Sequence, residues 1–272
     1  MRSAVTVCLV PEAHAGPFVF HGDLEVACSR AQALGFDAVE VFPSSADAID
    51  ARTLRHVLTR NRLELAAVGT GAGWLTRKLT LTHPEPAVRH QAQQFVAALV
   101  DFAGGFGAPA ILGSMQGRAE GQVSRTQALH WLAEALEQLG PRAHGHGVPL
   151  LIEPLNRYES NLLNTLAQTT DFLAPLRTQN VRVLADLFHM NIEEASIPRA
   201  FAEAGDRVGH VHFADSNRRA VGLGHTDVAA AVESLRRIGY TGYLSAEVLP
   251  APSSEEAAAQ TIASFRRLVP AP

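Results

Sequence analysis

The sequence predicts a (β/α)8 TIM barrel, an α/β fold in which eight parallel strands alternate with helices. The chain has 272 residues, close to the roughly 250 that such a barrel usually takes. Short apolar runs alternate eight times with longer segments whose apolar residues have helical spacing. No linker, internal repeat or low-complexity segment interrupts this alternation. We therefore expect a single barrel domain over residues 1–272.

The expected strands are short runs rich in Val, Ile, Leu and Ala. Continuous apolar runs are typical of parallel strands that are buried on both faces, whereas alternating runs indicate strands with one solvated face. In chain order the expected strands cover residues 4–10, 38–42, 65–69, 110–113, 148–153, 181–186, 208–213 and 243–248.

The expected helices lie between these runs and carry start and stop signals. An acidic turn from Asp23 begins one helix, Ser124 begins another, and Gly35 and Gly107 follow two helix ends. In chain order the expected helices cover residues 23–34, 46–62, 86–106, 124–144, 165–176, 198–204, 227–238 and 254–268.

A doubly wound open sheet is the alternative arrangement of such elements. It would normally carry a glycine-rich phosphate-binding turn after the first strand. Here the first strand leads into Pro11, Glu12, Ala13 and His14, so that signature is missing. The barrel is the better interpretation.

The composition excludes several classes of protein. With 47% hydrophobic and 18% charged residues, the chain has the composition of an ordinary globular protein. The net charge of −4 argues against a nucleic-acid partner, which would require clustered Lys and Arg. Two cysteines exclude a disulfide framework, and no apolar run has the length of a membrane span. We expect a cytoplasmic protein with no membrane partner.

Four of the later strands end in residues of metal-ligand type, namely Glu153, Asp186, His212 and Glu247. Active-site residues of these barrels lie at the carboxyl ends of the strands. A salt-bridged strand end would explain one buried carboxylate, but four such ends in succession favour a metal site. Their oxygen and nitrogen donors suit Mn²⁺, Mg²⁺, Co²⁺ or Zn²⁺. His210, one layer deeper than His212, is expected to be a core residue or a residue that supports a ligand, and not itself a ligand.

Polar segments directly follow three of these strands, and we expect them to form loops at the same end of the barrel. They contain Glu159, His189 and Arg218, each three to six residues beyond a proposed ligand. Trp74, residues 113–118 and the loop after the first strand are further candidates for lining the pocket.

At this point the chain resembles a known family, the sugar isomerase and epimerase barrels related to xylose isomerase. The resemblance is strong over residues 150–250 and closest to ketose and keto-sugar-acid 3-epimerases, such as D-tagatose 3-epimerase and 5-keto-L-gluconate epimerase. Weaker matches in the first half are GDLE, GFDAVEV and ILGSMQGR. The motifs that carry the strong match are IEPLNRYE, ADLFHMNIEE, HVHFADSNR, GHTD and EVLP.

The resemblance implies a role for each candidate residue. One divalent ion, Mn²⁺ first among those above, would be held by four ligands, and two of these would also transfer protons. Three further residues would hold the hydroxyl and carbonyl oxygens of the substrate. The implied ligands are Glu153, Asp186, His212 and Glu247, the proton-transfer pair is Glu153 and Glu247, and the substrate-binding residues are Glu159, His189 and Arg218.

The implied reaction is inversion at C3 of a ketose, or at the equivalent carbon of a keto-sugar acid, through an enediolate. One carboxylate removes the C3 proton, which the adjacent carbonyl acidifies, and the other returns a proton on the opposite face. The partner is thus a small sugar or sugar acid, and a homo-oligomer is possible. The alternatives are an aldose–ketose isomerase of the hydroxypyruvate-isomerase kind, an apurinic endonuclease, or a barrel that binds without catalysis.

Overall fold

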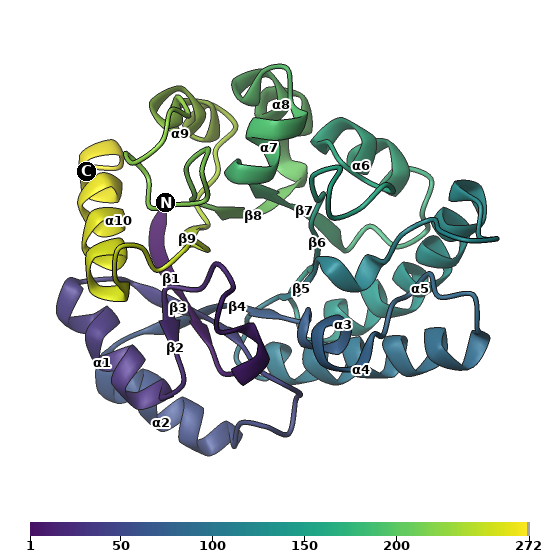
Figure 1. Cartoon of the computed structure of the whole chain (residues 1–272), viewed down its shortest axis with the longest axis horizontal. Coiled ribbons are helices and arrows are strands. Elements are labelled where there is room, and N and C mark those ends of the chain that lie inside the picture. Colours follow the sequence, from purple (N-terminus) through teal and green to yellow (C-terminus); the bar gives the residue numbers. More distant parts are fainter. Residues whose placement is uncertain (271–272) are drawn as a thin grey trace.

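In the computed structural model, which describes residues 1–270, eight parallel strands close into a barrel (Figure 1). Ring neighbours follow the chain order, and the last strand pairs with the first. The predicted fold class is confirmed, while the last two residues of the predicted domain lie outside the described range. The ring strands are β1 (Arg2–Cys8), β3 (Ala38–Phe42), β4 (Glu64–Gly69), β5 (Ala110–Leu112), β6 (Leu150–Ile152), β7 (Val181–Asp186), β8 (Val208–His212) and β9 (Tyr243–Ala246).

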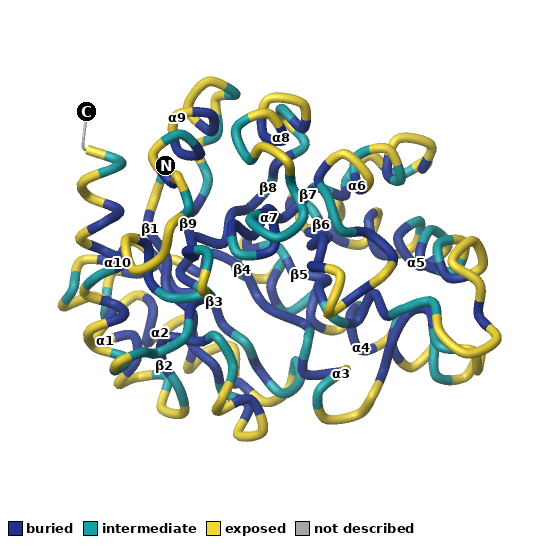
Figure 2. The backbone as a smooth tube through the Cα atoms, turned by 45° about the horizontal axis from the view of Figure 1, so that its top comes forward, coloured by how far each residue is buried: buried dark blue, intermediate teal, exposed yellow. Residues whose placement is uncertain are grey.

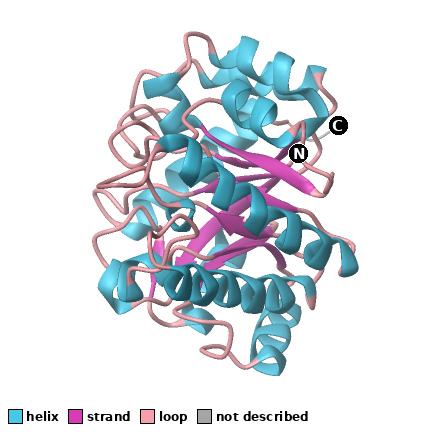
Figure 3. Ribbon diagram, turned by 90° about the vertical axis from the view of Figure 1, so that its right-hand side faces the viewer, coloured by secondary structure: helices cyan, strands magenta, loops and turns pink. Residues whose placement is uncertain are grey.

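The helices pack outside the strands, which Figure 3 shows in a side view. Three short 3₁₀ segments, η1 (Pro11–Ala13), η2 (Ser114–Gln116) and η3 (Gly205–Arg207), complete the connections. The α-helices are α1 (Leu24–Leu34), α2 (Ala51–Asn61), α3 (Ala72–Arg77), α4 (Pro86–Gly104), α5 (Arg125–Gly145), α6 (Leu166–Leu173), α7 (Leu187–Glu193), α8 (Ile197–Ala204), α9 (Val228–Arg237) and α10 (Ser254–Leu268).

Each expected strand and helix is present, with bounds that differ by a few residues. The largest shift is at α2, expected from residue 46, because the Asp50 side chain caps the helix by accepting from Thr53 N. Besides the three 3₁₀ segments, three elements were not predicted: α3, α7 and the two-residue strand β2 (Phe20–His21), which pairs with β1.

The segment after β7 corrects one prediction. Residues 187–193 were expected as a loop, yet they form α7. Asp186 ends the strand and caps this helix, since its carboxylate accepts hydrogen bonds from the backbone N of Phe188 and His189. The helix thereby fixes His189 one turn above a proposed ligand.

The interior of the barrel is apolar below the site. Ala67, Ile111, Leu151 and Leu184 form a buried cluster contributed by β4 to β7. Leu151 and Leu184 lie two residues before Glu153 and Asp186, so alternation along the strand places all four inward. The cluster therefore forms a dry layer under the polar residues.

Figure 2 shows the buried strands at the centre and the exposed residues on the outer helices and loops. This distribution is expected for strands covered on both faces. Within residues 1–270, no helix is both long enough and apolar enough to cross a membrane.

Candidate active site

Four side chains of ligand type meet at the carboxyl end of the barrel. Glu153 follows β6, Asp186 ends β7, His212 ends β8 and Glu247 follows β9. Each offers one donor atom, and these atoms lie within 4.8 Å of one another. His212 Nδ1 is 3.4 Å from Asp186 Oδ2 and 3.5 Å from Glu153 Oε1 and from Glu247 Oε2. The structure thus brings together all four residues predicted as metal ligands.

The cluster places three carboxylates and one imidazole away from solvent. Burial raises the pKa of Glu247 to about 7, and the neighbouring carboxylates Glu153 and Asp186 add to this. Burial would also raise the pKa of Asp186, but its electrostatic interactions with His189 and Arg218 and its hydrogen bond with His212 hold the pKa well below its usual value. Burial alone would lower the pKa of His212, yet the surrounding carboxylates raise it well above its usual value. The carboxylates therefore attract positive charge strongly.

The donor set fits the predicted metal ion. Within the described residues, the buried atoms Glu153 Oε1 and His189 Nε2 have no hydrogen-bond partner. A buried polar atom is normally satisfied, and a carboxylate oxygen beside two other carboxylates is best satisfied by a cation. None of the four ligand-type residues is a thiolate, so the set suits the harder divalent ions Mn²⁺, Mg²⁺, Co²⁺ and Zn²⁺.

A buried carboxylate lies behind His212. Glu40 of β3 has Oε1 3.2 Å from His212 Nε2 and Oε2 2.8 Å from His210 Nε2. Because a carboxylate accepts, His212 donates from Nε2 and leaves Nδ1 facing the cluster. Outer carboxylates orient histidine ligands in this way in many metal sites. His210, expected as a core or supporting residue, is buried and contacts Glu40, the carboxylate that also contacts His212.

His189 aims a donor at the same cluster. Asn156 donates to His189 Nδ1 from its backbone N, at 3.3 Å, and from its side-chain Nδ2, at 2.8 Å. Because Nδ1 accepts, the proton of the neutral ring is assigned to Nε2, which lies 3.7 Å from Glu153 Oε1. Asn156 Nδ2 also lies 2.9 Å from Glu159 Oε1, so one amide positions two predicted substrate-binding residues.

Arg218 spans two carboxylates at the edge of the cluster. Its Nη2 is 2.6 Å from Glu247 Oε2 and its Nη1 is 3.3 Å from Glu159 Oε1. The guanidinium carbon lies 4.8 Å from the centroid of the Phe188 ring. All three predicted substrate-binding residues, Glu159, His189 and Arg218, therefore border the metal-ligand cluster.

The loop that carries Arg218 is organised by Asp215. The Asp215 carboxylate accepts hydrogen bonds from the backbone N of Ser216, Gly222 and Thr226, at 2.7, 2.8 and 3.0 Å. Its backbone O accepts from Arg218 N at 2.9 Å, and Arg218 adopts a left-handed φ of 57°. Burial would raise the pKa of Asp215, but these backbone donors hold it below its usual value.

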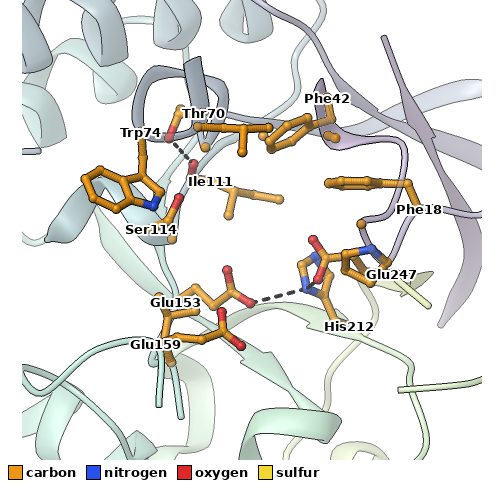
Figure 4. Close-up of a pocket in the computed structure, with 18 of the residues that line it drawn as sticks. Phe18, Phe42, Thr70, Trp74, Ile111, Ser114, Glu153, Glu159, His212 and Glu247 are labelled. Atoms are coloured by element: carbon orange, nitrogen blue, oxygen red, sulfur yellow. Dashed lines mark hydrogen bonds and ion pairs between the residues drawn. The ribbon is translucent and has the colours of Figure 1, made fainter. Parts of the chain in front are cut away.

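The cluster borders a cavity of about 330 Å³ at the carboxyl ends of the strands. Figure 4 shows Glu153 and Glu247 reaching toward this space from two sides, with Phe18 and Phe42 facing them. The two phenylalanine rings pack with centroids 4.6 Å apart. A few convergent polar groups opposite an apolar wall are typical of a site for a small molecule.

Some of the weaker pocket candidates also line this cavity. The lining includes Trp74, Gly113, Ser114 and residues 12, 13 and 15–18 of the loop after β1, whereas residues 115–118 do not line it. A Cβ at Gly113 would lie 2.6 Å from Glu153 Oε2, so this position has no room for a side chain. The glycine in ILGSM is thus explained by the proximity of a proposed ligand.

Comparison with known protein families matches residues 28–268 to the xylose isomerase-like TIM barrel family. The chain belongs to this family. L-ribulose 3-epimerase from Methylomonas sp. (strain DH-1) is 27% identical over 259 residues, 92% of this chain and 88% of the relative. D-psicose 3-epimerase from Ruminiclostridium cellulolyticum is 30% identical over 231 residues, which are 82% of this chain and 77% of the relative. The solved D-allulose 3-epimerase from Methylomonas sp. superimposes with a TM-score of 0.84 at 24% identity, covering 98% of each chain.

Sequence reasoning missed two residues of this xylose isomerase-like site. Glu40 could have been identified from the sequence, because a lone carboxylate in an apolar strand must be paired with another polar group. Asn156 carried no such signal, since an Asn in a polar segment after a strand is usually a turn residue. Its contact with His189 joins residues 33 positions apart and depends on how the loop after β6 packs against α7.

Proposed function

We propose that this protein is a divalent-metal-dependent epimerase that inverts C3 of a ketose, or the equivalent carbon of a keto-sugar acid. One observation carries the proposal: Glu153 and Glu247 line one cavity, follow separate strands, and each lie 3.5 Å from His212 Nδ1 (Figure 4). The relatives named L-ribulose 3-epimerase and D-psicose 3-epimerase support the same chemistry. The chain is an isomerase-class enzyme acting on sugars.

The two carboxylates are proposed to act on opposite faces of one carbon. Glu153 reaches the cavity from β6 and Glu247 from β9, so a sugar between them presents one face to each. The carboxylate on one side accepts the C3 proton and the carboxyl group on the other side donates one. Two positioned groups of this kind each contribute about 10²–10⁴-fold to the rate.

The remaining residues are proposed to hold the substrate and the negative charge that develops on its oxygens. His189 Nε2 and Arg218 Nη2 each lie 3.8 Å from Asp186 Oδ2, at the edge of the cluster, and are proposed to donate to oxygens of the bound sugar. Glu159, fixed by Asn156 and Arg218, accepts from a sugar hydroxyl. Glu153, Asp186, His212 and Glu247 would hold the divalent ion, which when bound supplies Lewis-acid polarisation of the sugar's oxygens.

The test is turnover of a panel of ketoses and keto-sugar acids with Mn²⁺ in deuterated water, followed by NMR. The proposal expects solvent deuterium at the inverted carbon and a ketose product. Label at C1 or C2 with an aldose product would instead identify an isomerase. No turnover of any sugar, together with cleavage of DNA at abasic sites, would overturn both.

Two further expectations are part of this proposal. We propose a cytoplasmic, reducing location, which suits the free thiols of Cys8 and Cys28. We also propose that the chain forms a homo-oligomer. Sedimentation of the purified protein measures this directly, and a monomer at all concentrations would contradict it.

A further inference from the structure

A second cavity, here called the side cavity, adjoins the one above the metal-ligand cluster. It has a volume of about 290 Å³. Trp74, Ser114, Leu155 and Glu159 line both cavities. Figure 4 shows Trp74, Ser114 and Glu159 together at one end of the first cavity, away from Phe18. A ligand longer than one sugar ring can therefore extend from the first cavity into the side cavity past these residues, on the side away from Phe18.

The walls of the side cavity are held in place by hydrogen bonds. Thr82 Oγ1 donates to the carbonyl of Gln116 at 3.0 Å, which ties the loop after α3 to η2. Arg118 Nη1 donates to the carbonyl oxygens of Tyr158 and Glu159, at 3.1 Å each, which ties the segment after η2 to the segment after β6. The side cavity is thus preformed by three segments.

Aromatic side chains are exposed at this cavity. The described residues include four exposed large hydrophobic side chains, and two of them, Trp74 at 39% and Tyr158 at 77%, line it. Lys78 Nζ lies 4.8 Å from the centroid of the Trp74 ring and covers one face of it. Exposed aromatic surface beside a mostly apolar hollow that holds a few polar groups is typical of a ligand site. The C–H face of a sugar ring matches such a surface.

The polar groups of the side cavity are of mixed sign. Arg118 and His83 line it together with Glu120 and Glu159. A phosphate-bearing group would require a surplus of positive charge, which these two carboxylates oppose. A neutral group with many hydroxyls can instead donate to the carboxylates and accept from the guanidinium.

We propose that the side cavity binds a second sugar unit, so that the substrate is a ketose or keto-sugar joined to another sugar by a glycosidic bond. This inference rests on the proposed epimerase function. The sugar that reacts lies over Glu153 and Glu247, the chain leaves between Trp74 and Glu159, and the second ring packs against Tyr158.

The test compares D-fructose with isomaltulose and maltulose, which carry a glucose unit on the same ketose. Deuterium incorporation at C3 reports turnover by the Mn²⁺-loaded enzyme. Independently, fluorescence of Trp74 in a Trp131→Phe background reports binding whether or not turnover occurs. We expect at least one of the two disaccharides to bind with an affinity about five- to tenfold higher than fructose, since one aromatic contact has that effect.

Variants at Tyr158 separate the side cavity from the catalytic site. Tyr158→Ala should raise KM for the preferred disaccharide about five- to tenfold and leave fructose turnover unchanged, and Tyr158→Phe should restore the disaccharide KM. Val26→Ala, at an exposed hydrophobic residue of α1, is the matched control and should change neither. Weaker binding of both disaccharides than of fructose, or equal KM values for both substrates in Tyr158→Ala and wild type, would overturn the side-cavity assignment. Absence of deuterium exchange with every sugar despite disaccharide binding would overturn the epimerase proposal and leave the second-sugar site supported.

Discussion

Glu153 and Glu247 combine two proposed roles, since each is a metal ligand and a proton-transfer group. Glu153→Gln and Glu247→Gln keep the side-chain shape but remove the ability to accept a proton. We expect each variant to lose about 10²–10⁴-fold in kcat while remaining folded. Steady-state kinetics measure kcat, elemental analysis measures the bound metal, and circular dichroism measures whether the variant is folded.

The matched control for these variants is Glu12→Gln. Glu12 lines the same cavity but lies outside the four-residue cluster, so its neutralisation should change the rate little. If Glu153→Gln or Glu247→Gln kept a near wild-type rate with full metal content, that residue would have no part in proton transfer.

Arg218 and His189 border the metal-ligand cluster, so their loss should weaken catalysis on the substrate more than it weakens metal binding. For Arg218→Ala and His189→Ala we expect metal content near one ion per chain and kcat/KM reduced about 10–10³-fold. Elemental analysis measures the metal content, and initial rates measure kcat/KM. Loss of the ion with unchanged KM in the remaining loaded enzyme would reverse this assignment.

Glu40 lies behind the site and acts on it through His212. In Glu40→Gln the amide can accept from only one of the two histidines, so His212 loses part of its orientation. We expect metal affinity to fall about 10–100-fold, measured by titration with Co²⁺ and its visible absorption. Glu64→Gln, at an exposed carboxylate on the neighbouring strand β4, should leave the affinity unchanged. Equal affinities in Glu40→Gln and wild type would limit Glu40 to a structural role.

Among the elements, the strand ends were predictable and the connections above them were less so. Glu153, Asp186, His212 and Glu247 stand out because ligand-type residues end otherwise apolar runs of the sequence. Their meeting follows from the barrel alone, since parallel strands present their carboxyl ends together. The start of α7 was not predictable, because its capping residue, Asp186, also ends a strand and is a candidate ligand, and either role explains an aspartate at that position.

The contacts that need packing between distant segments could not be predicted from the sequence. Periodicity shows that Glu40 lies on a strand, yet its pairing with two histidines of β8 requires the register of the closed barrel. The side cavity likewise depends on Arg118 and Thr82 joining segments that the sequence shows only as loops.

The loop of residues 215–226 is the element whose stability should follow pH. The Asp215 carboxylate has a lowered pKa in the folded state, so its stabilisation is present at neutral pH, above the unfolded value of about 4, and is lost as pH falls through the folded value. Asp215→Asn replaces one acceptor oxygen by a donor. We expect a loss of about 1–3 kcal/mol in the free energy of unfolding at pH 7, because hydrogen bonds to a charged group are broken.

Urea unfolding of wild type and Asp215→Asn at several pH values checks this prediction. The difference between them should shrink as pH falls below about 4, where the wild-type carboxylate takes up a proton. A difference that stayed constant with pH would show that shape, and not charge, holds the loop.

At the scale of the whole molecule, a bound ion should stabilise the barrel, because its ligands come from four successive strands, β6 to β9. Binding at about 100 times Kd adds about 2.7 kcal/mol, which for a chain of this size raises Tm by about 5–10 °C. Thermal unfolding with Mn²⁺ and with a chelator measures the shift. Asp186→Asn should abolish most of it. Identical Tm values for the wild type under both conditions would contradict the metal site.

The closure of the barrel has a consequence for how the protein is synthesised. β1 pairs with β9 over Arg2–Val5 and Tyr243–Ala246, and Thr6 Oγ1 donates to the carbonyl of Ala246 at 2.8 Å. A ribosome releases the first of these strands long before the last, so the growing chain carries an unpaired sheet edge during most of translation. A chain stopped before residue 243 would lack Glu247 and keep two open edges. It would be inactive and prone to aggregate, whereas completion of the final strand closes the sheet and supplies the second proton-transfer carboxylate in one event.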